Sequence, residues 1–570
     1  MTAMKKSITC LIVIMTLMLV NLSGCGGLHN HQVSAGQVDH VQTQGTYHYF
    51  LSVLLRHEGK LEQAIEELTK AYEADPQSSY LATELISLYA QKGDFNNAIV
   101  QGEEFLSKHA DHVELHLIMG GLYLNIREYS KAIREHKKVI ELDPKNLIAH
   151  LYLGIIYAEE KRFDKAEDIL KKMLTIDSEN IMGIYYYGKV LEKMKRFDEA
   201  EKMFKKAMSL NPYFEMALFN LAALYEKQEK LDKAIEVYRS YLAIDPTRLN
   251  LRVRTGELLI KKKKYEEAEQ EFREVLKIDP DNRDIKVALG LLYLDMKKFD
   301  LAVAEFSAIL KQNVLDDKVR YLLASTYEQK KEHALAIDEY SSIAVSSDLY
   351  VSARIRAAML LKNEGKIIPA IDLIRKAIKK KNDQIIFYLF VSTLYEEAGD
   401  NAASENMLKE GLKMAPKSTD LHYALGVLYD KTNRFSESIE TLQKILEFDP
   451  DNAETLNFIG YSYAVRGIHL DEAEKMILRA LKIKPENPYF LDSLGWVYFK
   501  KNQMDNAEKY LKEALELLPD EVEIIEHMGD LYVKQNKIKE AGDLYEKALK
   551  IDPQNLPLQK KLENLFKKKQ

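Results

Sequence analysis

The chain of 570 residues is 46% hydrophobic and 30% charged, with only 24 Gly and 13 Pro. This composition suits amphipathic helices with water-exposed charged faces better than it suits sheets. Acidic residues outnumber basic ones by 88 to 81 and the sequence pI is near 6.1, so the basic excess on which nucleic-acid binding depends is missing. We therefore expect no nucleic-acid partner.

The first 24 residues are predicted to be a signal peptide. Lys5 and Lys6 form a short positive region, and residues 8–20 are an apolar run too short to be a comfortable membrane anchor. The sequence LSGC at 22–25 follows, and it resembles the bacterial lipobox, in which cleavage occurs before the cysteine and that cysteine carries lipid. The resemblance implies that Cys25 is lipidated. An ordinary signal peptide, or an uncleaved helix with an incidental cysteine, is the alternative.

Cysteine content and charge agree with a lipid anchor. Cys10 lies in the segment that would be removed, which leaves Cys25 as the only thiol and allows no intrachain disulfide. The remaining chain is acidic, so its surface would not hold it to an anionic membrane and the lipid would have to. Residue 26 is Gly, whereas in bacterial lipoproteins an Asp there would favour the inner membrane. We expect a protein of the bacterial cell envelope, anchored in the outer membrane and facing the periplasm.

Residues 25–44 are predicted to be a flexible, lipidated tether, because they are polar, contain Gly and show no apolar periodicity. His29, His31 and His40 raise the question of a metal site. No Cys or acidic cluster joins them, and a solvated linker is the better interpretation. We expect no bound metal.

From Gly45 onward a pattern of 34 residues repeats fifteen times, with one extra residue in the thirteenth repeat near 465–469. Residues 488–521 show it well, since Leu491, Gly495 and Tyr498 stripe a first helix and Ala507 and Leu511 a second. The repeats begin at Gly45, Ser79, Val113, Leu147, Ile181, Glu215, Leu249, Arg283, Asp317, Val351, Ile385, Thr419, Ala453, Pro488 and Val522.

Small residues mark two fixed places in this frame. Position 20 is Ala in thirteen repeats and Ser in two, and position 8 is Gly in nine and Ala in three. Position 11 is Tyr in eleven repeats and position 32 is Pro in ten. The pattern resembles the tetratricopeptide repeat over residues 45–555. The resemblance implies an all-α fold, a right-handed α-solenoid superhelix of about fifteen helix-turn-helix repeats, with a concave wall lined mainly by the first helices.

The regularity of the pattern suggests how the array is divided. We expect an N-terminal block over 45–316, a less regular and softer joint over 317–418, and a C-terminal block over 419–555. Val314, Asp348 and Asn382 replace the terminating Pro in and before the joint, although ordinary sequence drift is an alternative explanation. Residues 556–570 are predicted to form a capping helix with an apolar stripe of Leu558, Leu562, Leu565 and Phe566.

No catalytic motif stands out. The sequence lacks GxxxxGK[ST], HExxH, GxSxG and CxxC, and its many paired carboxylates are typical of solvated helix faces. We therefore predict no catalytic residues, no cofactor and no enzymatic activity. A chaperone-tail carboxylate clamp, known in the family, is not expected either, because repeats five to seven supply two of its five residues.

Partner binding is the better hypothesis. By resemblance to the family, positions 2, 5, 6, 9, 12 and 13 of each first helix face the groove, and here they are rich in aromatic residues, which favour protein contacts. The predicted partner-binding residues are Phe458, Tyr461, Trp496 and Phe499 with Asn457 and Asp492, and Tyr185, Tyr186 and Phe219. We expect Trp496 to be partly exposed. About half of the aromatic residues would instead fill seams between neighbouring helices.

The sequence therefore predicts a non-catalytic, membrane-anchored scaffold that binds protein or peptide segments in its groove, in the assembly of a cell-envelope complex. The alternative is an enzyme or enzyme subunit with a site in the groove, acting for example on envelope polysaccharide or peptidoglycan.

Overall fold

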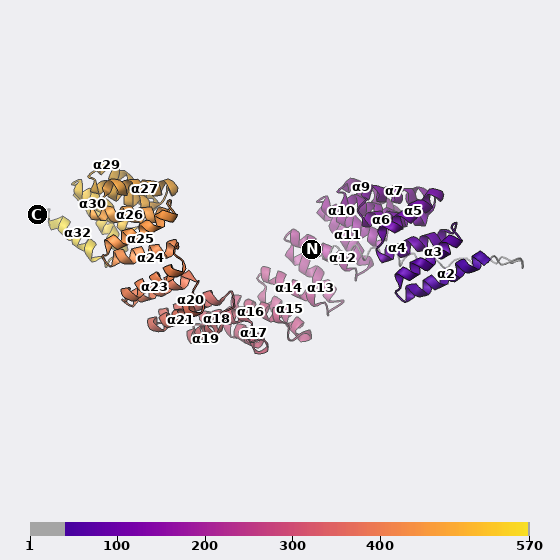
Figure 1. Cartoon of the computed structure of the whole chain (residues 1–570), viewed down its shortest axis with the longest axis horizontal. Coiled ribbons are helices and arrows are strands. Elements are labelled where there is room, and N and C mark those ends of the chain that lie inside the picture. Colours follow the sequence, from indigo (N-terminus) through magenta and orange to yellow (C-terminus); the bar gives the residue numbers. More distant parts are fainter. Residues whose placement is uncertain (1–39, 568–570) are drawn as a thin grey trace. The chain divides into compact units, whose positions relative to one another are not determined.

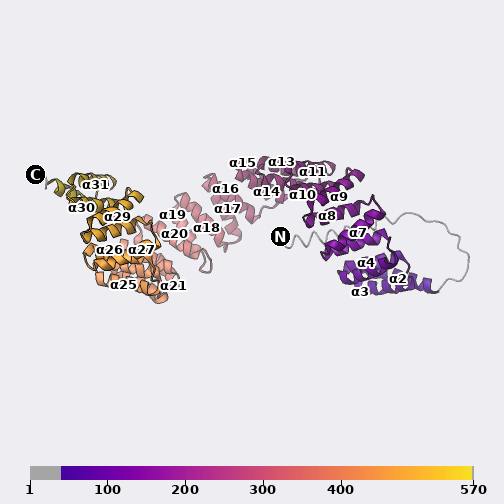
Figure 2. The same ribbon diagram turned by 90° about the horizontal axis from the view of Figure 1, so that it is seen from above.

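The computed structural model describes residues 40–567, and every regular element within that range is a helix, α2–α32 (Figure 1). Figure 2 shows the helices following one another in chain order as stacked hairpins. The predicted all-α repeat superhelix is confirmed. The signal peptide, Cys25 and the tether up to residue 39 lie outside the described residues.

Each repeat contributes two helices that pack against each other. The first helices are α2 (His40–His57), α4 (Ser79–Lys92), α6 (Val113–Asn125), α8 (Leu147–Glu159), α10 (Ile181–Lys193), α12 (Glu215–Lys227), α14 (Leu249–Lys261), α16 (Arg283–Asp295), α18 (Asp317–Gln329), α20 (Tyr350–Asn363), α22 (Ile385–Glu397), α24 (Thr419–Lys431), α26 (Ala453–Arg466), α28 (Pro488–Lys500) and α30 (Val522–Lys534). The second helices are α3 (Leu61–Ala74), α5 (Phe95–Lys108), α7 (Tyr129–Leu142), α9 (Phe163–Ile176), α11 (Phe197–Leu210), α13 (Leu231–Leu242), α15 (Tyr265–Ile278), α17 (Phe299–Gln312), α19 (His333–Ser342), α21 (Ile367–Lys380), α23 (Asn401–Met414), α25 (Phe435–Phe448), α27 (Leu470–Ile483), α29 (Met504–Leu517) and α31 (Ile538–Ile551), and α32 (Leu556–Lys567) follows the last repeat.

The helix starts agree with the sequence frame. Thirteen of the fifteen first helices begin at the predicted residue, and α20 begins one residue early at Tyr350. The exception is α2, which begins at His40, so residues 40–44 are helical rather than part of the tether. Gly45 lies within this helix and close to α3, since a Cβ added to it would lie 3.1 Å from Cβ of Ala74.

The turn between the two helices depends on one backbone conformation. The fifteenth residue of every repeat has a positive φ, between 55° and 86°. Five repeats place Gly there, and the other ten place a residue with a side chain, mostly Lys or Asn. Left-handed backbone costs such residues about 1–2 kcal/mol. The extra residue of the thirteenth repeat lies in this turn, where Gly467 and His469 both have positive φ.

Close approach between the helices of a repeat explains the Gly at position 8. A Cβ added to Gly495 would lie 2.7 Å from Cγ of Leu511, and one added to Gly154 would lie 2.8 Å from Leu170. Both leucines occupy position 24 of their repeats, and both are fully buried. The small residue on the first helix therefore receives a large one from the second, which sets the spacing of the hairpin.

The described residues divide into two compact units, one that ends at Pro280 and one that begins at Asp281. The predicted joint, 317–418, lies within the second unit, and its softness stays a prediction. One local irregularity falls there, since α19 has only ten residues. The guanidinium of Arg354, a buried residue, donates to the carbonyls of Tyr340 and Ile343 at the end of α19, the latter at 3.0 Å. The arginine thus donates hydrogen bonds to carbonyl groups that the end of the helix leaves without a backbone donor.

The last helix covers the end of the second unit. Leu558 and Leu565 of α32 are buried against α31, in a cluster with Tyr545 and Ala548. Lys561 binds Glu526 at 2.7 Å and Asp530 at 2.6 Å, which ties α32 to α30 as well. That α32 caps the array stays a prediction.

We predict that Gly495→Leu destabilises the fold by roughly 1–3 kcal/mol, because the added side chain overpacks against Leu511. The control is Gly121→Leu, since an added Cβ at Gly121 meets nothing within 4 Å. Urea unfolding followed by far-ultraviolet circular dichroism measures both variants. Equal midpoints for Gly495→Leu and the parent would show that this contact does not set the helix spacing.

Candidate functional site

The C-terminal groove-side residues centre on a buried ion pair between α28 and α30. Nδ1 of His527 lies 2.9 and 3.0 Å from the two carboxylate oxygens of Asp492. The two residues are only 8% and 5% exposed. Asp492 was predicted to hydrogen-bond a partner's backbone, but its carboxylate is already engaged within the chain. Whether it also contacts a partner stays a prediction.

Trp496 lies in the seam between α28 and α30. Its ring stacks on that of His527 at a centroid distance of 4.1 Å and on that of Phe499 at 4.6 Å. Trp496 is 9% exposed, so the expectation of a partly exposed indole is wrong. The reason is that the neighbouring repeat places an imidazole directly over it, which the sequence of one repeat cannot show.

The same seam reaches two repeats further back. Tyr461 on α26 donates its hydroxyl to Glu523 on α30 at 2.5 Å, across α28. The ammonium of Lys534 lies 4.7 Å from the ring centroid of Phe499, and that of Lys500 lies 5.1 Å from the Trp496 ring. Aromatic rings, carboxylates and cations of three successive first helices therefore form one connected cluster.

Electrostatics in this cluster follow from burial and from the carboxylates. Burial raises the pKa of the Asp492 carboxyl. Burial alone would lower the pKa of His527, but the charge of Asp492 outweighs it and raises that pKa above 6.5. Glu523 and Asp530 act in the same direction on His527. The pKa of Tyr461 is also raised, first by burial and then by its hydrogen bond to Glu523. The charge of Asp492 thus favours the protonated form of His527.

In the preceding repeat, α26 carries residues whose side chains are not fully engaged by contacts within the chain. Phe458 is half-buried, and Tyr423 lies edge-on to it at 5.7 Å. The Oδ1 atom of Asn457 is buried and has no hydrogen-bond partner among the described protein atoms. A buried acceptor without a donor is costly and uncommon. Phe458 can therefore offer a partner an aromatic face, and Asn457 carries a buried acceptor whose hydrogen bond is unmet among the described residues.

A second cluster lies on α10 and α12. The rings of Tyr185 and Tyr186 lie 5.2 Å apart, and Asn220 donates Nδ2 to the Tyr185 hydroxyl at 3.0 Å. Lys189 places its ammonium 5.3 Å from the Tyr186 ring, and burial lowers its pKa. Tyr185 is buried, whereas Phe219 is 39% exposed. The predicted residues Tyr185 and Tyr186 therefore lie in contact, and Asn220, the residue after Phe219, binds to this pair.

His527 and Glu523 were not among the predicted site residues. Both occupy groove positions of the fifteenth repeat, 6 and 2, so the repeat frame could have pointed to them. Their importance comes from the stacking of successive first helices, which sets His527 over Trp496 and Glu523 within reach of Tyr461. A search for aromatic residues alone misses them.

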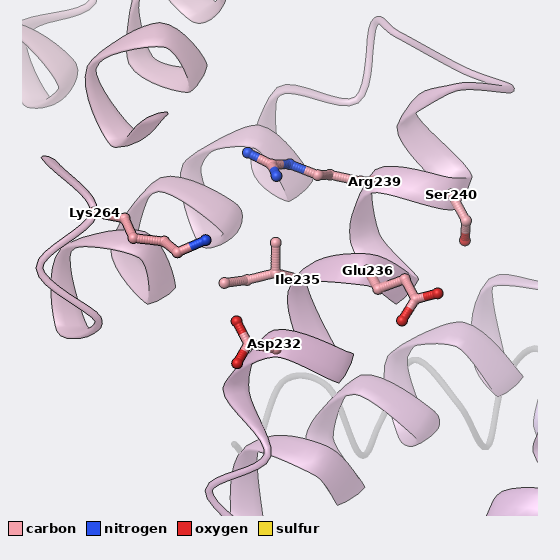
Figure 3. A pocket seen from close by; sticks show the side chains of 6 residues that line it. All are labelled: Asp232, Ile235, Glu236, Arg239, Ser240 and Lys264. Atoms are coloured by element: carbon pink, nitrogen blue, oxygen red, sulfur yellow. The ribbon is translucent and has the colours of Figure 1, made fainter. Parts of the chain in front are cut away.

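A surface hollow elsewhere offers no better site. About 450 Å³ in volume, it lies along α13 and is lined by Asp232, Ile235, Glu236, Arg239, Ser240 and Lys264 (Figure 3). Three of its charged groups are paired within the chain: Asp232 with Lys262, Arg239 with Glu267 at 3.0 Å, and Lys264 with Glu267 at 3.0 Å. Across residues 40–567 we find no cluster of three or more possible metal ligands and no helix long and apolar enough to cross a bilayer.

Family models match most of the described chain. A tetratricopeptide repeat model matches residues 259–326, 395–457 and 498–565, and another matches 462–522. A model described as the C-terminal ARM domain of tetratricopeptide repeat protein 21 matches residues 60–255. The chain belongs to the tetratricopeptide repeat family. Between 326 and 395, where the matched segments of the general repeat model are interrupted, lie the short α19 and the buried Arg354.

Known proteins resemble this tetratricopeptide repeat chain in parts. The TPR repeat-containing protein PA4667 of Pseudomonas aeruginosa is 29% identical over 156 residues, 27% of this chain and 26% of that protein. Segments of this chain span 21–26% of the length of the curated relatives they match. A tetratricopeptide repeat protein from Parabacteroides merdae is 20% identical, with a TM-score of 0.34, over 44% of this chain and 99% of that one. The Cut9–Hcn1 hetero-tetramer of the APC/C is 15% identical, with a TM-score of 0.34, over 85% and 97%.

We predict that the emission of Trp496, the only tryptophan, is blue-shifted and protected from iodide. It should rise as the pH passes upward through the pKa of His527, because a protonated imidazole quenches a stacked indole more than a neutral one does. Protonation of His527 stabilises the folded state. This contribution is fully present below pH 6.5 and is lost as the pH rises through the pKa that His527 has in the folded protein.

Asp492→Asn removes the charge that holds this pKa up, so the rise in emission should move to lower pH. His527→Gln is the control and should show no such rise. A fluorescence titration of the parent and both variants measures the effect. An unchanged titration in Asp492→Asn would contradict the coupling of the two residues.

Proposed function

We propose that this protein is a lipid-anchored, non-catalytic adaptor of the bacterial cell envelope, which binds a protein segment along the first helices of its C-terminal repeats. The family fold itself suggests an adaptor with protein partners. The anchor, the periplasmic location at the outer membrane and the choice of site are our proposals. They rest on the LSGC sequence at 22–25 and on the residues of α26 and α28.

The observation that carries the proposal is the unpaired Oδ1 of Asn457. A segment lying across α26 could displace the side chains that cover this oxygen and donate a backbone N–H to it. Apolar side chains of the segment could cover the half-buried rings of Phe458 and Phe499. Trp496 and Asp492 have a different role in this proposal. Trp496 stacks on Phe499 and Asp492 pairs with His527, so these two residues hold α28, which carries Phe499, against α30.

A second binding region on α10 and α12 is favoured by Lys189. Its half-buried ammonium lies over two tyrosine rings, and burial lowers its pKa. This region, with the exposed ring of Phe219, would extend the contact area of a long partner. The alternative of an enzyme or enzyme subunit acting in the groove receives no comparable support from an arrangement of nucleophile and base among the described residues.

The anchor is tested with Cys25→Ser. We predict that this variant incorporates no fatty acid and leaves the membrane fraction, while its helical content stays unchanged because Cys25 precedes the first described helix. Metabolic labelling with a fatty acid and flotation of membranes measure the two effects. Membrane fractionation identical to that of the parent would overturn the lipoprotein assignment.

The site is tested with Asn457→Leu. Removing a buried acceptor that lacks a donor should leave the free protein as stable as the parent or slightly more so. The same change should weaken binding of a partner captured from solubilised membranes by about 1–3 kcal/mol, because the donor of the partner would then be buried unpaired.

The partner is identified by placing a photo-crosslinking residue at position 458 and, as a control, at the exposed position 368 on α21. One discrete cross-linked protein is expected from position 458 only. The thermal unfolding temperature and the affinity for that cross-linked protein are then compared between the Asn457→Leu variant and the parent. Lower stability together with unchanged affinity would exclude this site.

A further inference from the structure

The first helix of the array carries an apolar stripe that is open to solvent. Tyr47, Phe50 and Leu54 of α2 are 63%, 61% and 61% exposed. Their spacing of three and four residues places them on one face of the helix. Scattered exposed apolar residues are ordinary, but a continuous stripe on one helix marks a surface that is covered by something.

The repeat frame shows how unusual this exposure is. Leu54 is the tenth residue of its repeat, and the tenth residue is buried in all fourteen repeats that follow. Tyr47 is the third residue, which is buried in thirteen of those repeats and half-buried at Leu81. The second helix of the preceding repeat covers these positions. Gly183, for example, lies beside Met173, with 3.1 Å between the Met173 sulfur and an added Cβ.

The sequence immediately upstream does not predict such a helix. In the 34-residue frame, the second helix of an earlier repeat would occupy residues 27–40. That stretch is polar and has no apolar periodicity, and α2 has already begun at His40. The stripe therefore lacks the neighbour that every other first helix has among the described residues.

We infer that a second copy of this chain covers the stripe, with the two α2 helices antiparallel about a two-fold axis near Phe50. That arrangement sets Phe50 against its counterpart and Tyr47 beside Leu54 of the other copy. Symmetric pairing of one patch with itself is the commonest form of homo-oligomer. The inference does not depend on the proposed function.

The charges on α2 favour this occupant. The helix contains no Asp or Glu, although the whole chain carries a formal net charge of −7. Its arginine is engaged within the chain, because Arg56 contacts Glu84 at 3.0 Å, and the ring of His48 lies 2.6 Å from the carboxylate of Glu67. The stripe thus offers no charge that would select an acidic or a basic partner. It is also the face on which two copies of an acidic chain meet without repulsion between carboxylates.

The other end of the array limits the association to a dimer. Head-to-tail growth would need an open second helix at the C-terminus, and there α32 buries Leu558 and Leu565 against α31. With that face of α31 covered by α32, it is not open to the stripe of another copy, and the stripes of two copies pair with each other in the arrangement that we infer. A closed pair, rather than a filament, results.

The test uses the full chain with Cys10→Ser and Cys25→Ser, so that no lipid takes part in the association. We expect sedimentation velocity to show a concentration-dependent monomer–dimer equilibrium. Phe50→Glu should raise the dissociation constant about 30-fold or more, because two like charges would face each other across the axis. Ile368→Glu, at an equally exposed position on α21, is the matched control and should leave the dimer unchanged.

Mixing chains that carry Phe50→Glu with chains that carry Phe50→Lys should restore dimers, which only a pairing of Phe50 with its own counterpart predicts. A chain that is monomeric at all concentrations would overturn the inference. So would a dimer that Phe50→Glu leaves intact, or a mixture that stays monomeric. A monomer in which residues 1–39 protect Tyr47 from iodination would assign the stripe to the same chain and would also overturn it.

Discussion

The fold depends on the close contact between position 8 of one helix and position 24 of the next. Wherever Gly occupies position 8, as at Gly154 and Gly495, a leucine, an isoleucine or an aromatic ring from the second helix fills the space that a Cβ would need. This contact fixes the distance between the helices of a hairpin, and with it the surface each hairpin offers to the next. A constant hairpin, repeated, gives an array in which each repeat is covered by its neighbours.

The apolar face of each repeat is covered by the adjacent repeats. The array therefore departs from its regular packing at its two described ends and where a repeat is irregular. At the C-terminus α32 replaces the missing repeat and Lys561 secures it. At the N-terminus α2 has no such cover, and its apolar stripe is exposed. Where α19 is short, a buried Arg354 supplies the hydrogen bonds that a regular helix end would have left open.

In the C-terminal cluster, groove positions differ in whether their polar atoms have partners within the chain. Asp492, Trp496 and His527 satisfy one another through an ion pair and a stack, so their polar and aromatic surfaces are used to join repeats. Asn457 retains a buried acceptor without a donor. A residue whose polar atoms are fully partnered stabilises the wall, and a residue with an unmet hydrogen bond is the better candidate for binding. This distinction separates structure from recognition within one groove.

The sequence by itself determined the helices, their starts and the family, because a 34-residue period with small residues at positions 8 and 20 leaves few other ways to bury an apolar stripe. It also placed Tyr185 beside Tyr186 and Phe458 beside Asn457, since these are neighbours in one helix. Only the tertiary structure decided that Trp496 is buried under His527 and that Tyr461 reaches Glu523, 62 residues away. Contacts between successive first helices depend on the rotation from one repeat to the next. That rotation is a property of packed neighbours, and a pattern read along one helix does not contain it.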